Sequence, residues 1–90
     1  MFKMTWALVA EHADEWTGDD FSQAAAVLDE KVGAAVSASA MNSDAQAHFR
    51  ATFLAPVRDS LSGEGRTAIE SGHLWSAAAG PLLVALAPAA

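Results

Sequence analysis

Cysteine is absent from the chain, which excludes a scaffold held by disulfides or by thiolate-bound metal. Lysine and arginine are scarce, with five residues against eleven aspartates and glutamates, so no basic stripe is present to displace counterions from a nucleic acid. Long hydrophobic runs are also missing. The charge-free stretch from Leu74 to Ala90 is interrupted by Gly80, Pro81 and Pro88, and a membrane-spanning helix needs about 20 apolar residues.

A targeting signal is not expected either. The apolar stretch over residues 6–10 is short and ends at Glu11, whereas a signal peptide needs a longer apolar region and a cleavage site of small residues. We therefore expect no signal peptide and no transmembrane helix, and a cytoplasmic location by default.

Alanine is the most prominent feature of what is present. It supplies 22 of the 90 residues, and hydrophobic residues together make up 52% of the chain, which is far too rich for a disordered segment. A chain of this size buries only roughly 60–65% of the surface that it exposes when unfolded, and each buried alanine methyl contributes little. The sequence predicts one small domain that gains stability from a partner surface.

The negative charge is concentrated in the first third of the sequence. Residues 1–30 carry seven acidic side chains against Lys3, a net charge of −6, whereas residues 31–90 carry four acids and four bases. This asymmetry indicates an acidic surface that could face a basic partner. One alternative function is therefore a small acidic regulatory or inhibitor protein that binds a basic surface.

Apolar residues recur at helical spacing in the first 16 residues. Phe2, Trp6, Val9, Ala13 and Trp16 follow one another at steps of four, three, four and three. This spacing predicts a helix from about residue 3 to residue 16 with these side chains on one stripe.

A second helix is expected from residue 20 to about residue 41. Asp19 or Asp20 can cap its first turn, and Asp20 followed by Gln23 has the spacing of a capping box, which satisfies free N–H groups at the start of a helix. The apolar residues that follow again recur at steps of four and three. They are Phe21, Ala25, Leu28, Val32 and Ala35.

Two further helices are expected after residue 41. Ser43 and Gln46 also match a capping box, so a third helix should begin at residue 44, and Pro56 should kink or end it. Residues 62–65 are expected to form a loop, and a last helix should extend over residues 66–79.

These segments together predict an all-α fold, a small irregular bundle of three to four short helices with an apolar C-terminal arm. Residues 1–80 would form a single helical domain. Residues 81–90 would form an apolar segment that is packed or bound by a partner. Residues 82–86 are too few to classify by period and could be a helical turn, an edge strand or an arm.

Glu70 and His73 have the spacing of a metal-binding pair, because Glu-x-x-His places both side chains on one face of a helix. A metal site needs several such ligands to converge, and few other hard ligands are present. The chain also lacks a cysteine nucleophile and a Gly-x-Ser-x-Gly elbow. We therefore expect a protein that is not an enzyme and that has no metal, no cofactor and no small-molecule substrate.

The short sequence Trp16-Thr17-Gly18 resembles the Trp-x-Gly turn of the small helical-hairpin proteins exported by type VII secretion systems. The size, acidity, alanine content and lack of cysteine are also similar to that group. In those proteins the turn joins two long helices, so the resemblance implies a helical hairpin and export. A type VII-secreted protein of this type is a second alternative.

The aromatic residues lead to the main functional interpretation. Three tryptophans and four phenylalanines are many for so small a domain, and aromatic anchors among small residues are typical of interfaces, although core packing would also explain them. We expect a non-enzymatic interaction or assembly subunit that forms a homo-oligomer or docks on a larger protein, without nucleic acid or membrane. The expected interface residues are Phe2, Trp6, Val9, Trp16, Trp75, Leu82, Leu83, Val84 and Leu86.

Overall fold

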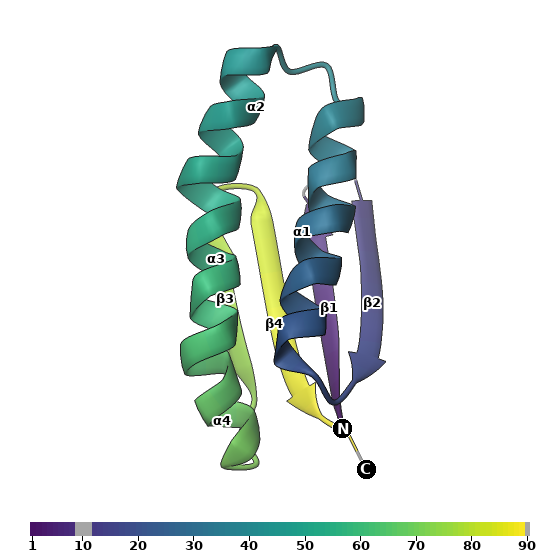
Figure 1. Ribbon diagram of the computed structural model, residues 1–90, viewed down its shortest axis with the longest axis vertical. Coiled ribbons are helices and arrows are strands. Elements are labelled where there is room, and N and C mark those ends of the chain that lie inside the picture. The colour runs from purple at the N-terminus through teal and green to yellow at the C-terminus, as the bar shows by residue number, and fades with distance from the viewer. Residues whose placement is uncertain (9–11, 90) are drawn as a thin grey trace.

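The computed structural model describes residues 1–8 and 12–89, which form one layer of β-sheet and one layer of helix (Figure 1). The four strands are antiparallel and lie in the order β2-β1-β4-β3, so the first and last strands of the chain are the central pair. The strands are β1 (Phe2–Leu8), β2 (His12–Gly18), β3 (Trp75–Ala79) and β4 (Leu82–Pro88). The helices are α1 (Phe21–Ala38), α2 (Ser43–Phe49), α3 (Ala55–Ser60) and α4 (Arg66–Glu70).

This is an α+β fold, and the predicted all-α helical bundle is wrong. The two ends of the chain supply the sheet, and the middle supplies the helices. Of the helices predicted over residues 3–16 and 66–79, the second is present over residues 66–70, and strands take the place of helix over residues 3–8, 12–16 and 75–79.

Residues 2–8 and 12–18 form the antiparallel pair of strands β1 and β2 instead of the predicted helix. Along β1 the side chains of Phe2, Met4, Trp6 and Leu8 are buried, and the residues between them point to the other side of the sheet. This is the two-residue period of a strand, and it competes in the same segment with the helical spacing of the aromatic residues. The strand period prevails because β1 pairs on both sides, and a central strand places every second side chain in the core.

The C-terminal segment belongs to the same sheet. β4 lies between β1 and β3, so residues 82–88 are a central strand rather than an apolar arm, and β3 replaces the end of the helix predicted over residues 66–79. Gly80 and Pro81 form the two-residue turn between β3 and β4, and Gly80 has a φ of +56°. Glycine adopts this φ without steric cost, which makes the tight hairpin possible.

Helix α1 confirms the predicted second helix. Asp20 is its N-cap, because the carboxylate accepts hydrogen bonds from the backbone N–H groups of Ser22 at 2.8 Å and Gln23 at 3.2 Å. The helix ends at Ala38 rather than near residue 41. Its buried residues are Ala24, Leu28, Val32, Gly33 and Val36.

The second helical segment is continuous from Ser43 to Glu70. Asn42 is its N-cap, one position before the predicted cap, and its side chain accepts a hydrogen bond from the Ala45 N–H at 2.8 Å. None of the helices in the described ranges is long and apolar enough to cross a membrane.

Two widened turns keep this segment helical through residues that usually interrupt a helix. In the turn Arg50–Leu54, before Pro56, the Ala55 N–H bonds to the carbonyl of Arg50, five residues back instead of four. Proline has no N–H and its ring crowds the carbonyl four residues earlier, so a wider turn gives the ring room. The second widened turn, Leu61–Gly65, occupies the predicted loop over residues 62–65, so that prediction is wrong.

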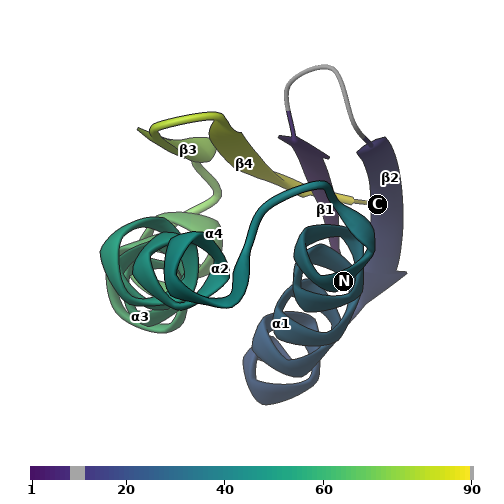
Figure 2. The same ribbon diagram turned by 90° about the horizontal axis from the view of Figure 1, so that it is seen from above.

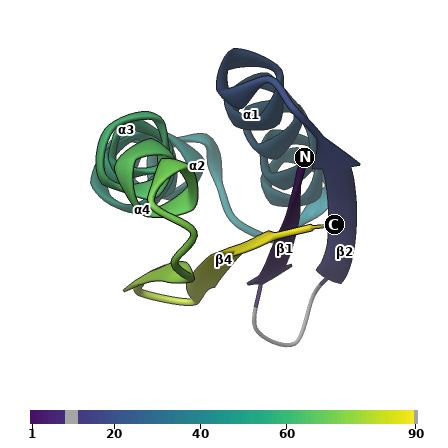
Figure 3. The ribbon, with the colours of Figure 1, turned by 90° about the horizontal axis from the view of Figure 1, so that it is seen from below.

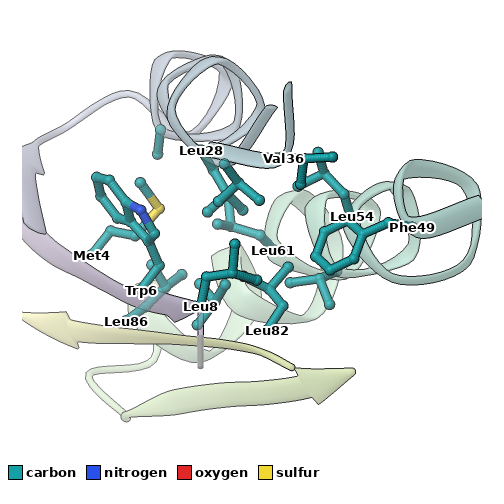
Figure 4. Close-up of a cluster of buried hydrophobic side chains, with 14 of the residues drawn as sticks. Met4, Trp6, Leu8, Leu28, Val36, Phe49, Leu54, Leu61, Leu82 and Leu86 are labelled. Atoms are coloured by element: carbon teal, nitrogen blue, oxygen red, sulfur yellow. The ribbon is translucent and has the colours of Figure 1, made fainter. Parts of the chain in front are cut away.

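The core fills the space between the sheet and the helices (Figure 4). It combines β1 with β4 on one side and α1 with the second helical segment on the other. Its labelled members include Met4, Trp6, Leu8, Leu28, Leu61, Leu82 and Leu86, and each of them is at most 5% exposed.

Candidate interaction surface

Only one face of the sheet is covered by helices. Both helical segments lie on the same side, and within the described residues no element lies over the opposite face, as views from the two ends show (Figures 2 and 3). Antiparallel sheets often have one face in water, and that face is usually rich in polar side chains. The composition of the uncovered face therefore indicates whether it is suited to solvent.

We define the open face as the strand residues that alternate with the core residues and point away from the helices. Five of them are alanine, one is leucine and two are charged, so the face carries less charge than a solvated sheet face usually does. The residues are Lys3, Thr5 and Ala7 of β1, Ala13, Glu15 and Thr17 of β2, Ser76 and Ala78 of β3, and Leu83, Ala85 and Ala87 of β4.

A shallow hollow of about 560 Å³ lies on the open face across β2, β1 and β4. The strand register places its open-face residues in two neighbouring rows, and in the second row two small alanines lie beside a protruding leucine. The first row is Glu15, Thr5 and Ala85, and the second row is Ala13, Ala7 and Leu83.

The exposed large hydrophobic side chains of the described residues lie on or beside this face. Leu83 is 49% exposed and belongs to it, and Leu74, 75% exposed, directly precedes β3 and lines a second hollow of about 230 Å³ over β3 and β4. Met1, 64% exposed, directly precedes β1 and extends the β1–β4 ladder, since its carbonyl accepts from the Ala89 N–H at 3.0 Å. A gathering of exposed apolar side chains is typical of an interaction surface.

The two charges of the open face neutralise each other. The Nζ of Lys3 lies 2.8 Å from the Oε2 of Glu15 on the neighbouring strand. The open face is thus neutral in a chain whose formal net charge is −6.

Away from this face, Arg50 connects the two helical segments by donating to the carbonyl of Gly33 at 3.0 Å and to the hydroxyl of Ser37 at 2.8 Å.

Most of the predicted interface residues lie in the core. Phe2, Trp6, Leu82, Val84 and Leu86 are at most 3% exposed, because they are alternate residues of the central strands and point toward the helices. In this fold their side chains lie between the sheet and the helices and are not part of the chain's exposed surface. Their apolar character reflects packing within the chain.

The remaining predicted interface residues are distributed differently. Leu83 lies on the open face. Trp16 and Trp75 are half-buried against the core, and the ring of Trp16 meets that of Phe2 edge-on at 5.6 Å between centroids. Val9 lies outside the described residues.

Sequence reasoning missed the other members of the open face, among them Thr5, Ala7 and Ala85. They are small and unremarkable as single residues. The signal that identifies them is the large apolar side chain at every second residue, at positions 2, 4, 6 and 8 and again at 82, 84 and 86, which defines two faces once both segments are read as strands.

Glu70 and His73 do not share a helical face, because the helix ends between them. Gly72 has a φ of +79°, and the N–H groups of Gly72 and His73 bond back to the carbonyls of Ile69 at 2.9 Å and Ala68 at 2.8 Å. This is a Schellman motif, in which glycine closes the last turn. In the described part of the chain, no three His, Asp or Glu side chains are grouped so that they could hold a metal ion.

The Trp16-Thr17-Gly18 turn lies at the end of strand β2 and does not join two helices. Gly18 has a local packing role there, because a Cβ at this position would lie 2.5 Å from two ring carbons of Trp16. The helical hairpin implied by the type VII resemblance is therefore not the fold of this chain.

Comparison with known proteins does not assign this chain to a family. No family model, curated protein or solved structure matches it.

Proposed function

We propose that this chain is a non-enzymatic assembly subunit that binds another protein surface through the open face of its sheet. The observation that supports the proposal is the composition of that face: five alanines and Leu83 surround one compensated ion pair, Lys3–Glu15. Removing apolar surface from water stabilises an association by roughly 25 cal/mol per Å². Charges are costly to desolvate, and few charges are present on this face.

A flat protein surface fits this face better than a small molecule does. Sites for small molecules are usually concave and enclose most of the ligand, with a few convergent polar groups. The hollow over β2, β1 and β4 is shallow, and its polar side chains on the open face are Thr5 and Glu15, with the latter already paired to Lys3. The open face therefore offers a broad contact surface but few polar groups that could orient a small ligand.

The experiment compares the size of the native complex formed by matched variants in an extract of the source cells. Ala85→Lys introduces a charge at the centre of the open face, and Ala34→Lys introduces the same charge at an exposed position of α1. We expect the wild-type chain and Ala34→Lys to elute as a complex larger than a monomer. Ala85→Lys should elute as a monomer with an unchanged melting temperature.

Two results would contradict the proposal. One is a wild-type chain that elutes as a monomer in the extract and also stays monomeric when purified at about 1 mM. The other is an Ala85→Lys variant that stays in a complex of wild-type size.

A further inference from the structure

We infer that the partner on the open face is a second copy of this chain, packed face to face about a two-fold axis, with Leu83 of each copy in the hollow of the other. This inference rests on the proposed function and identifies the partner. Three features support it: the shape, the charge and the area of the open face.

The shape of the face is self-complementary. A two-fold interface uses the same patch on both copies, so the patch must contain both a protrusion and a matching depression. Leu83 protrudes from β4, and the hollow beside it is lined by the small side chains of Ala7, Ala13 and Ala85. When two such faces meet, each leucine can fill the space above the partner's alanines.

The charge distribution favours a copy of the chain over a basic protein. The open face is neutral, since Lys3 and Glu15 form an ion pair within each copy. Two copies therefore meet without like-charge repulsion at this face, even though each has a formal net charge of −6. A basic partner would gain more from the acidic surface elsewhere on the chain than from a neutral face.

The area of the face fits a weak dimer. Three strands of seven residues and one of five, about 4.8 Å apart and about 3.3 Å long per residue, give a sheet of roughly 410 Å². Two copies bury roughly 820 Å² before the protruding leucine side chains are counted, and specific interfaces begin near 1,000–1,200 Å². The dimer should therefore dissociate on dilution.

The first test measures the dimer dissociation constant of the purified chain by sedimentation equilibrium. Leu83→Glu should raise this constant by about 10- to 100-fold, because a buried leucine is lost and a charge must be desolvated. Ala34→Glu, at an exposed position of α1, introduces the same charge away from the face and should leave the constant unchanged. A dimer that persists in Leu83→Glu overturns the inference.

The second test fills the hollow. Ala13 is exposed at the rim of the hollow, so Ala13→Phe can fold normally while its ring covers the space above Ala7. If Leu83 enters the hollow of the partner, the larger side chain weakens the dimer by about 10-fold or more although it adds apolar surface. A dimer that is strengthened shows a non-specific apolar patch and overturns the inference. Thermal melting of each variant checks that the chain is folded.

The two proposals fail in different ways. In one outcome the purified wild-type chain is monomeric up to about 1 mM, yet it elutes from the extract in a complex that Ala85→Lys disrupts. This outcome overturns the inference that the partner is a second copy, but it supports the open face as a binding surface. A purified dimer that neither Leu83→Glu nor Ala85→Lys weakens overturns both.

Discussion

Gly65 lies so close to the indole of Trp75 that a Cβ on it would come within 3.2 Å of the ring, and within 2.9 Å of the Cδ1 of Leu86. Glycine thereby lets the second helical segment approach β3 and β4 closely. Gly65→Ala should destabilise the fold by about 1–3 kcal/mol, because the added methyl group forces the helix away from the sheet or strains its packing. Urea unfolding followed by circular dichroism measures this change.

Gly63, two residues earlier in the same helical segment, is the matched control for that variant. A Cβ at Gly63 would have no neighbour within 4 Å. Gly63→Ala should therefore stabilise the chain by about 0.4–1 kcal/mol, since alanine favours the helix and restricts the unfolded chain. If both alanine variants were stabilising, the close approach of the helix to the sheet would be refuted.

The cap of α1 gives a second prediction. Asp20 accepts two backbone hydrogen bonds, so Asp20→Ala should reduce the free energy of unfolding by about 1 kcal/mol. The neighbouring Asp19 pairs with the N-terminal amine at 2.8 Å, but both groups are more than half exposed. Asp19→Ala should cost less than about 0.5 kcal/mol, and an equal or larger loss at Asp19 would contradict the assignment of the cap.

The two glycines with positive φ should differ in their response to substitution. Gly72→Ala should cost about 1 kcal/mol, from backbone strain alone, because nothing lies within 4 Å of its Cβ position. Gly80→Ala should cost about 2 kcal/mol or more, because its Cβ would also lie 2.7 Å from the Cζ of Phe53. Equal losses in denaturant unfolding would show that Phe53 does not pack on the hairpin turn.

Substitution of Trp6 distinguishes a role of this side chain in the core from a role in an interface. Its side chain is 3% exposed, and its buried indole N–H has no hydrogen-bond partner among residues 1–8 and 12–89. Trp6→Ala should therefore lower the free energy of unfolding by about 3–5 kcal/mol at every protein concentration, because the substitution leaves a cavity in the core. A variant that kept its stability and lost only self-association would place Trp6 in an interface instead.

The parts of the fold that could be predicted from sequence are those where a local signal acts alone. Asp20 followed by an apolar stripe identifies α1, because capping and helical spacing agree there. In residues 2–16 two periods coexist, and only pairing with β4, far away in sequence, selects the strand. Local propensity cannot supply that information, since the stability of a central strand comes from its neighbours.

The candidate site was less accessible to sequence reasoning than the fold. Large aromatic residues such as Trp6 and Phe2 stand out in a sequence, and in this chain they fill the core. The open face consists of small residues such as Ala7 and Ala85, which are distinctive only as a group. Leu83 could be identified in the sequence, but its neighbours Leu82 and Val84 could not be separated from it until the register was known.

The central claim, that the chain associates with a second copy of itself through the open face, is tested most directly by methyl NMR spectra of the wild-type chain on dilution from about 1 mM to about 10 µM. We predict that the methyl resonances of Leu83 and Ala85 shift with concentration, while those of Ala26 and Ala34 on the exposed side of α1 remain fixed. Shifts confined to α1, or no shift at any concentration, would contradict the account.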